Sequence, residues 1–467
     1  MINLSRQNYI NNKLVLSIIA TGLLSFSGIV VETAINVGFP LLIKTFHVNI
    51  STVQWMSTGY FLIVSILLPL SNYFLKKFSL RSLFFLANSL FILGLIIDVG
   101  APCFEILLLG RIIQGLGAGI GLPLMTTIIL KKSPLNRVGM LMGVGTLVMT
   151  IAPAIGPTYG GIILKHFSWH YIFIILIPIL IASSLIGIAT IPKTLPGKNR
   201  HKIDFITWII IAIFFIISIY FFSKISYFLK HPATQLSLII LLLPMLGFTL
   251  RLKKNKIYLF NSRIFMNPRF NWLLLSLLLT QSCSLGLSFI LPNFIEIVNH
   301  NNTLQAGLAV LPGALMGAIS APISGLVLDK VRSVLPVLCG VIFQIIAILF
   351  FLITIQHLTT PIIIWGYTLY MLGNGLTFSN ILTLGLKGLE ENIQNSGITV
   401  YNSIQQFAGA MGTSIVSSII AVAQYGRGDD KLTGTTIGTY NSLILIIFSL
   451  VVTLYFCGKV YKIKNKD

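Results

Sequence analysis

Long apolar runs separated by short polar loops limit what this chain can fold into. A helix needs about 17 to 25 apolar residues to cross the hydrocarbon core of a bilayer, and each run reaches that length. We therefore predict fourteen transmembrane helices, over residues 14–43, 53–74, 82–100, 105–130, 138–163, 171–191, 205–223, 234–250, 271–293, 304–328, 334–354, 361–386, 399–423 and 438–458. The composition agrees, because only 9% of the 467 residues are charged, against roughly 25% in soluble domains. These features predict an all-α polytopic membrane protein.

Lysine and arginine residues are distributed unevenly between the two sets of loops. The two termini and the loops on their side hold 25 of the 32 residues, and the opposite loops hold six. Cytoplasmic loops carry the positive excess in membrane proteins, so we expect both termini in the cytoplasm. The formal net charge of +21 is spread over short loops in this way. We therefore expect contact with a lipid bilayer and no binding of nucleic acid.

The two ends of the chain repeat each other. Residues 110–131 match residues 366–387 at an offset of 256, with three glycines and the final lysine in common. Parallel six-helix halves are a transporter architecture, with the substrate site between the halves near the bilayer midplane. We predict three parts: an N-terminal six-helix bundle over 1–191, two inserted helices over 192–270, and a C-terminal six-helix bundle with a basic tail over 271–467.

Glu32 is the only acidic residue that lies well within a predicted span. An ionised group there costs at least about 2.5–3.5 kcal/mol, so such a residue normally faces a water-filled cavity or a partner. Polar and small residues share its helix face, at steps of three or four: Thr21, Ser25, Gly28, Glu32 and Asn36. We expect Glu32 to couple ion and substrate movement and Asn36 to face the substrate cavity.

Arg111 and Asp98 are the other charged candidates for coupling. An arginine inside a span needs an acceptor, either a carboxylate or helix-end carbonyls. Gln114 lies on the same face one turn on, and we expect it to line the substrate cavity. Arg111 could instead extend outward, since Glu105 lies near the external end. Asp98 lies near the external end of its span, where it either handles protons or cations or is a solvated helix end.

Two aromatic residues in segment 53–74 are candidates for lining the cavity. Trp55 lies near the start of this segment, where a place in the interfacial aromatic belt is an equally simple explanation. Tyr60 lies deeper, and a role in the substrate cavity is expected for it.

Segment 138–163 ends in a run of small residues interrupted by prolines. Pro157 removes a backbone donor and bends the helix. Gly156 and Gly160 form a G-x-x-x-G contact face, followed directly by Gly161. We expect this end to be tightly packed and bent, as a hinge or a seal would be.

The loop at 75–81 and its repeat mate at 329–333 are candidates for gating. Lys77 and Arg81 occupy the first loop and Asp329 the second. Charges at the cytoplasmic ends of helices can lock adjoining helices together. A positive-inside anchor explains the basic residues equally well, but it does not explain Asp329.

Several classes of chemistry are absent from the sequence. It contains no ATP-binding G-x-x-x-x-G-K-[ST] loop and no H-E-x-x-H motif, and its four cysteines have no metal-ligand spacing. We expect no metal, no cofactor and no enzyme activity. Uphill transport would therefore depend on an ion gradient.

Motifs spread over the chain resemble those of the major facilitator superfamily, in its fourteen-helix drug:proton antiporter branch. The similar stretches are ETAINVGFP from 32, QWMSTGYFL from 54, LLGRIIQGLGAG from 108, APAIGPTYGG from 152, LPGALMGAISAPISGLVLDK from 311 and NSIQQFAGAMGTS from 402. The resemblance is strongest to multidrug exporters of Gram-positive bacteria and implies the major facilitator fold in a bacterial cell membrane. It also implies that Glu32 handles protons or cationic drugs, that Arg111 assists proton transfer, and that the 156–161 run is the antiporter motif. The loop after the second helix departs from the family pattern, because Asn72 and Lys76 stand where glycine and aspartate are often found. Gln405 stands where an arginine is common.

These observations predict a monomeric antiporter that exports amphipathic, cationic small molecules in exchange for protons. A cationic substrate and a proton would compete for Glu32, which couples the two fluxes. Export of one specific metabolite, such as an amino acid, peptide or lipid, by the same fold is the alternative. A membrane sensor that does not transport is a further alternative, which the lack of a soluble effector domain disfavours.

Overall fold

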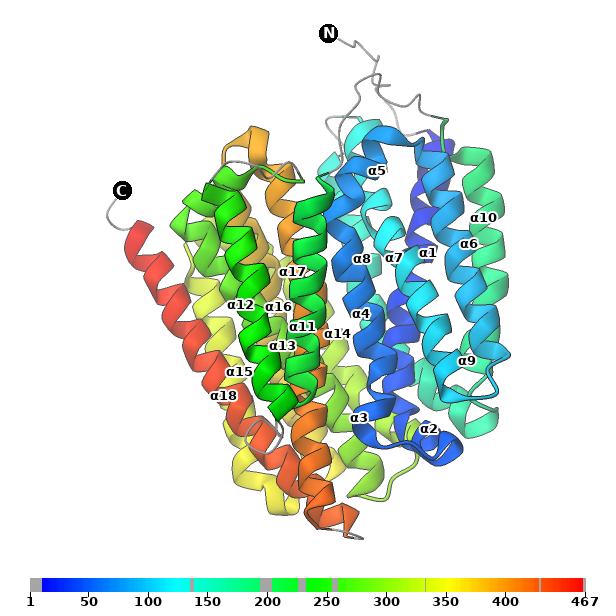
Figure 1. The fold of residues 1–467 in the computed structure, drawn as a ribbon, viewed down its shortest axis with the longest axis vertical. Helices are drawn as coiled ribbons and strands as arrows, with labels where there is room; N and C mark the ends of the chain where they lie inside the picture. The colour runs from blue at the N-terminus through cyan, green and yellow to red at the C-terminus, as the bar shows by residue number, and fades with distance from the viewer. Residues whose placement is uncertain are drawn as a thin grey trace.

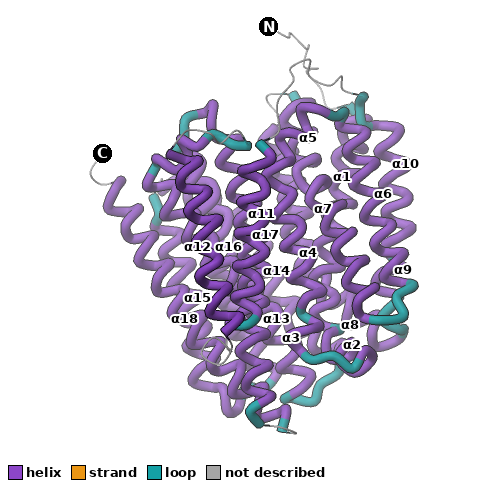
Figure 2. The backbone as a smooth tube through the Cα atoms, in the orientation of Figure 1, coloured by secondary structure: helices purple, strands orange, loops and turns teal. Residues whose placement is uncertain are grey.

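The computed structural model is a bundle of long helices. It describes residues 11–134, 138–193, 204–225, 232–253, 259–331, 333–427 and 430–464. No β-strand occurs among these residues, and the long helices run side by side along one axis (Figures 1 and 2). Twelve helical stretches are long and apolar enough to cross a membrane. Helices α8 and α16, of 29 and 28 residues, lie in the same bundle, which is compatible with fourteen crossings.

The helices follow the order of the predicted apolar runs. The first part of the chain forms α1 (Asn12–Val37), α2 (Phe39–Phe46), α3 (Ile50–Val53), α4 (Trp55–Leu67), η1 (Leu68–Leu70), α5 (Ser71–Lys77), α6 (Leu80–Val99), α7 (Phe104–Lys132), α8 (Val138–His166), α9 (Tyr171–Ile174) and α10 (Leu176–Thr190). The next two are α11 (Phe205–Ser223) and α12 (Pro232–Lys253). The last part forms η4 (Ser262–Met266), α13 (Pro268–Ile297), α14 (Thr303–Val331), α15 (Leu335–Thr354), η5 (Ile355–His357), α16 (Thr360–Lys387), α17 (Glu391–Tyr425) and α18 (Lys431–Lys464).

The first predicted run is wrong as a single helix, and the second forms one candidate crossing over Ile50–Leu70 with local breaks. The run at 14–43 breaks at Gly38 into α1 and α2, because Pro40 cannot donate a backbone hydrogen bond and its ring clashes with the carbonyl four residues earlier. In the second run, Pro69 lies in the short 3₁₀ segment η1 between α4 and α5. Proline therefore lies at the break between α1 and α2 and at the one between α4 and α5.

Helices from the first part of the chain lie together on one side, and helices from the last part lie on the other (Figure 1). In the first part, α1 packs against α7, α8 and α10, and α6 packs against α7. In the last part, α16 packs against α14 and α15, and α13 packs against α17 and α18. The main contacts between the two parts are α8 with α14 and α4 with α17. The predicted boundaries of the two bundles stay a prediction.

Both ends of the chain point to the same end of the bundle (Figure 1). We call this the cytoplasmic end, after the charge distribution of the loops. The opposite end, where α2 and α3 lie, is then the external end.

The outer surface of the bundle is apolar. Large hydrophobic side chains are exposed along it, including Ile353 at 83% and Trp365 at 74%. In water such a surface would drive aggregation, whereas in a membrane it contacts lipid tails. The bundle therefore has the surface of a multi-pass membrane protein.

The inserted helix α11 touches both parts of the bundle. Its Trp208 indole donates a hydrogen bond of 2.8 Å to the Ile66 carbonyl of α4. Its Phe215 ring stacks on Phe407 of α17, with centroids 4.5 Å apart. The guanidinium of Arg251 on α12 pairs with Asp204, before α11, at 2.8 Å. The inserted pair is thus fastened to the bundle and to itself by specific contacts.

We predict that Phe407→Ala lowers the thermal stability of the detergent-purified protein. Removing a buried phenylalanine ring from a packed interior costs about 3–5 kcal/mol in soluble proteins, and packing contacts also hold membrane helices together. The control is Phe448→Ala, since Phe448 is 65% exposed on α18. The test is the melting temperature of each variant, measured as the loss of the monodisperse size-exclusion peak after heating. Equal melting temperatures for the two variants would contradict the anchoring role of Phe407.

Candidate functional site

Three charged residues are buried together inside the N-terminal part of the bundle. Glu32 lies on α1, Asp98 near the end of α6 and Arg111 on α7. Their exposed fractions are 4%, 0% and 0%. We call these residues, with Gln114, the charge cluster. It lies in the external half of the bundle, since α1 ends five residues after Glu32 and α7 begins seven residues before Arg111.

Arg111 is held by neutral acceptors. Its Nη1 donates to Oε1 of Gln114 at 2.6 Å, and its Nε donates to the carbonyl of Met56 at 3.1 Å. Its guanidinium lies over the ring of Tyr60, with Cζ 4.6 Å from the centroid. Arg111 therefore points into the bundle and does not extend outward toward Glu105.

Gln114 connects Arg111 to Asp98. While its Oε1 accepts from Arg111, its Nε2 donates to Oδ2 of Asp98 at 2.5 Å. Asp98 is fully buried, so the structure does not place it as a solvated helix end. The amide bridges a cation and a carboxylate that make no direct ion pair within 4 Å among the described residues.

Glu32 faces the same cluster from α1. It interacts electrostatically with Arg111, and Asn36 lies next to its carboxyl one helical turn on. The Oδ1 of Asn36 in turn accepts a hydrogen bond of 2.9 Å from Ser57 on α4. One polar atom in each charged group is buried without a hydrogen-bond partner among the described residues: Oε1 of Glu32, Oδ1 of Asp98 and Nη2 of Arg111. Such unsatisfied groups are expensive in a membrane interior, and they leave room for a proton or a ligand to bind.

Of the two predicted aromatic cavity residues, Tyr60 contacts the charge cluster and Trp55 packs against the hydrophobic core. Tyr60 is 4% exposed and lies beneath Arg111, so it belongs with the charge cluster. Trp55 is partly buried at the start of α4, packed against the hydrophobic core. It makes none of the hydrogen bonds of the cluster.

The glycines of the predicted antiporter motif lie where α8 contacts other helices. A side chain at Gly156 would collide with Thr33 Oγ1, and one at Gly160 would come within 2.5 Å of the Ala34 carbonyl oxygen. A side chain at Gly161 would come within 2.7 Å of the Thr303 carbonyl on α14. Across the same contact, one at Gly307 of α14 would collide with the carbonyl oxygen of Pro157. The motif therefore joins α1 to α8 and α8 to the other part of the bundle.

Two of the predicted gating residues, Arg81 and Lys77, contact groups of the N-terminal part. Arg81 donates from Nε to the Ile191 carbonyl at 2.7 Å, where it caps the end of α10. Lys77 is exposed, with its ammonium 5.4 Å from the ring centroid of Tyr73. Asp329 lies on α14, and its side chain is outside the described residues.

Sequence reasoning missed a set of neutral residues between the two parts of the bundle. Gln54, which precedes α4, and Thr58, in the first turn of α4, form hydrogen bonds with α17. Their partners there are Thr413, Ser414 and Ser417. Each of the five is at most 1% exposed. The usable signal was weak, because only the spacing of the α17 hydroxyls places them on one helix face.

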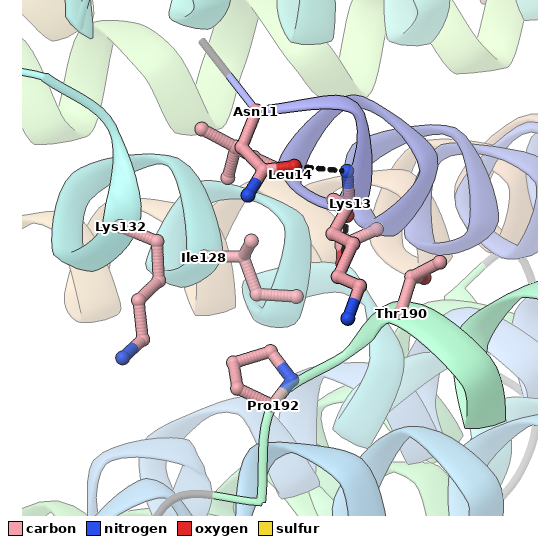
Figure 3. A pocket seen from close by; sticks show the side chains of 8 residues that line it. Asn11, Lys13, Leu14, Ile128, Lys132, Thr190 and Pro192 are labelled. Atoms are coloured by element: carbon pink, nitrogen blue, oxygen red, sulfur yellow. Dashed lines mark hydrogen bonds between the residues drawn. The ribbon is translucent and has the colours of Figure 1, made fainter. Parts of the chain in front are cut away.

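One pocket, of about 190 Å³, opens at the cytoplasmic end between the ends of α1, α7 and α10 (Figure 3). It is lined by Asn11, Lys13, Leu14, Ser17, Ile128, Lys132, Thr190 and Pro192. Glu32 lies 19 residues beyond Lys13 on α1, roughly 28 Å at 1.5 Å per residue. This pocket is therefore separate from the charge cluster. Among the described residues no group of three His, Cys, Asp or Glu side chains could hold a metal.

The sequence of residues 21–413 matches the family profile of the Major Facilitator Superfamily. The chain belongs to the major facilitator superfamily. This facilitator is 32% identical over 422 residues to lincomycin resistance protein LmrB of Bacillus subtilis, which covers 90% of this chain and 87% of the relative. It is 31% identical over 453 residues to lincomycin resistance protein LmrB of Listeria monocytogenes, and the alignment covers 94% of this chain and 96% of that relative. The putative multidrug resistance protein MdtD of Pectobacterium carotovorum is 25% identical over 420 residues, with 89% and 90% covered.

Solved structures of other transporters have the same fold. The POT family transporter PepTSo superposes with a TM-score of 0.71 at 12% identity, covering 97% of this chain and 99% of the other. A bacterial homologue of the human lysosomal transporter Spinster gives 0.67 at 12% identity, covering 97% and 98%. The predicted family and fold class are confirmed. This facilitator is a secondary transporter for small molecules, not an enzyme, in a bacterial cell membrane.

We predict that Gly160→Ala lowers both transport and melting temperature. The new methyl group meets the backbone of Ala34, which cannot rotate away, and overpacking of this kind costs about 1–3 kcal/mol. Gly325→Ala on α14 is the control, since a side chain there meets no atom within 4 Å. Alanine favours helix by about 0.8–1 kcal/mol over glycine, so the control should be neutral or stabilising. Full activity and stability of Gly160→Ala would show that α1 and α8 need no close contact.

Proposed function

We propose that the protein exports amphipathic, cationic small molecules in exchange for protons by alternating access. The observation that carries the proposal is the placement of Glu32 in a buried cluster with Arg111 and Asp98. A carboxylate in this setting can be neutralised either by a proton or by a cationic substrate. The two ligands would then exclude each other at one group, which is sufficient to couple their movements.

The order of steps follows from that competition. A cationic substrate that enters from the cytoplasm displaces the proton from Glu32, and the proton leaves to the cytoplasm. After the external end opens, a proton from outside neutralises Glu32 and releases the substrate. Arg111 and Asp98 are assigned to hold the proton route in position, and Tyr60, Asn36 and Gln114 to line it.

The drug-resistance names of relatives support the substrate class. The relatives from Bacillus and Listeria are named for lincomycin resistance, and the one from Pectobacterium for putative multidrug resistance. We therefore assign lincomycin and cationic dyes as first substrates to test. The protein is proposed to work as a monomer in the lipid bilayer, with no nucleic-acid partner.

Contacts between the two parts of the bundle support alternating access. The glycines of α8 meet α14, and the hydroxyls of α17 meet α4, at the external end. The structure therefore has its external end closed. Opening to the outside requires these contacts to separate.

We predict that Glu32→Gln lowers proton-driven efflux of a cationic dye by at least about tenfold. The substitution removes the charge that attracts the cation, and an interaction with a charged group contributes about 1.5–3 kcal/mol. Dye flux is measured in proteoliposomes with an imposed pH gradient, with lincomycin as competitor. Glu105→Gln is the control, because Glu105 is exposed at the same end of the bundle.

Full coupled efflux by Glu32→Gln would overturn the assignment of Glu32. Transport of a single metabolite, with no flux of dyes or lincomycin, would instead favour a dedicated metabolite exporter.

A further inference from the structure

The start of α4 lies between the charge cluster and the other part of the bundle. Residues 54–58 form one turn, and its groups contact different neighbours. The Met56 carbonyl contacts Arg111 of the charge cluster and the Ser57 hydroxyl contacts Asn36 on α1, while Gln54 and Thr58 contact α17.

On the cluster side, the turn is tied to both α7 and α1. The Met56 carbonyl accepts from Arg111 Nε at 3.1 Å. Ser57 donates to Asn36 Oδ1 at 2.9 Å, and Asn36 lies one turn beyond Glu32. A change in the position of Arg111 therefore acts directly on the backbone of this turn.

On the other side, Gln54 and Thr58 make a closed set of hydrogen bonds with α17. Gln54 Nε2 lies 3.2 Å from Thr413 Oγ1 and 3.3 Å from Ser414 Oγ, and its Oε1 accepts from Ser417 at 2.9 Å. Thr58 Oγ1 lies 3.2 Å from the hydroxyls of both Thr413 and Ser414. We call these five residues the polar clasp.

The chemistry of the clasp suits a contact that opens and closes. Neutral hydrogen bonds between protein groups exchange for hydrogen bonds to water with a small net change in free energy. An apolar contact of the same area would oppose separation in water much more strongly. Since lipid could not satisfy these groups, they must face water, not the bilayer, when the two parts separate.

We propose that Gln54 and Thr58 are positioning residues that open and close the external end in response to the charge of Glu32. The proposal rests on the proposed function, since it takes Glu32 as the proton site. With Glu32 neutral, Arg111 stays with Gln114 and Asp98, as in the structure, and the clasp is made. With Glu32 charged, Arg111 is drawn toward α1 and takes the Met56 carbonyl with it, which separates Gln54 and Thr58 from α17.

This direction is the one that antiport requires. A transporter with charged Glu32 must stay open to the outside until a proton replaces the substrate, because closing earlier would allow a cycle without proton entry. Protonation then permits closure and return. The titratable groups that interact with Arg111 are Asp98 from α6, Tyr60 from α4 and Glu32 from α1.

The experiment measures how external pH controls access to the external end. Val53→Cys is the reporter, because Val53 is fully buried on α3, which packs against α17. It is placed in the full-length protein after replacement of the four native cysteines, and labelled in proteoliposomes with a membrane-impermeant maleimide. Rates are divided by those of Tyr425→Cys, which is 83% exposed, to correct for thiol ionisation.

With an intact clasp, normalised labelling should be high at external pH 8 and about tenfold lower at pH 6, the factor expected for two to three neutral hydrogen bonds. Glu32→Gln should give low labelling at both pH values. Thr58→Val and Gln54→Leu should give high labelling at both. Thr58→Ser keeps the hydroxyl and should restore the pH dependence, whereas Thr354→Val, far along the chain on α15, should leave it unchanged.

Two results would separate the failure of this inference from failure of the proposed function. If Thr58→Val and Gln54→Leu fold, by monodisperse elution, and keep the normal pH dependence, the clasp does not respond to Glu32. In that case proton-driven dye efflux still reports on the proposed function. If labelling does not depend on pH while dye efflux is proton-driven, the inference is also overturned.

Discussion

The burial of Arg111 sets the arrangement of the N-terminal part of the bundle. A guanidinium remains charged at any physiological pH, so a fully buried one requires polar or aromatic partners from the protein. Here α4 supplies a backbone carbonyl and an aromatic face, and α7 itself supplies Gln114, which reaches Asp98 on α6. Glycines make this possible, since a side chain at Gly94 would come within 2.6 Å of the Gly110 carbonyl and one at Gly110 would collide with Asp98. The close approach of α6 and α7 and the charge cluster therefore depend on each other.

The sequence repeat places a neutral pair where the C-terminal part would hold its own charge cluster. At the offset of 256, Arg111 corresponds to Tyr367 and Glu32 to Ser288. The structure brings Tyr367 and Ser288 within 3.4 Å of each other, oxygen to oxygen. The positions that hold Glu32 and Arg111 in the N-terminal part thus hold neutral hydroxyl residues in the C-terminal part. The asymmetry at this level lies in side-chain chemistry within one shared backbone plan.

The residues that were predicted from sequence are those whose side chains require a large free energy to be buried in a membrane. A carboxylate or a guanidinium inside an apolar run needs an explanation, so Glu32 and Arg111 were identified without coordinates, and Asp98 was a candidate. The break at Gly38 could also have been read from Pro40, because the effect of proline on a helix is local. The polar clasp could not be predicted in this way. A threonine or serine in a helix can satisfy its hydroxyl on its own backbone, as Thr413 does with the Gly409 carbonyl, so it carries no signal of a distant partner. Its partners Gln54 and Thr58 lie more than 350 residues away along the chain.

The two contacts between the halves at the external end differ in kind, and the difference assigns them different mechanical roles. The contact of α8 with α14 is made by backbone against glycine, so any rotation that brings the helices closer produces a collision. The two helices can rotate about such a contact, but they cannot move closer together. The clasp is made by side-chain hydroxyls and an amide that water can replace, so it can separate and form again. Glu32 is adjacent in sequence to Thr33 and Ala34, which meet the glycines of α8, while Arg111 binds the turn that carries the clasp. In the proposed mechanism, a change of charge at Glu32 acts between the α8–α14 contact and the polar clasp, where a small displacement of α1 or α4 would open the external end.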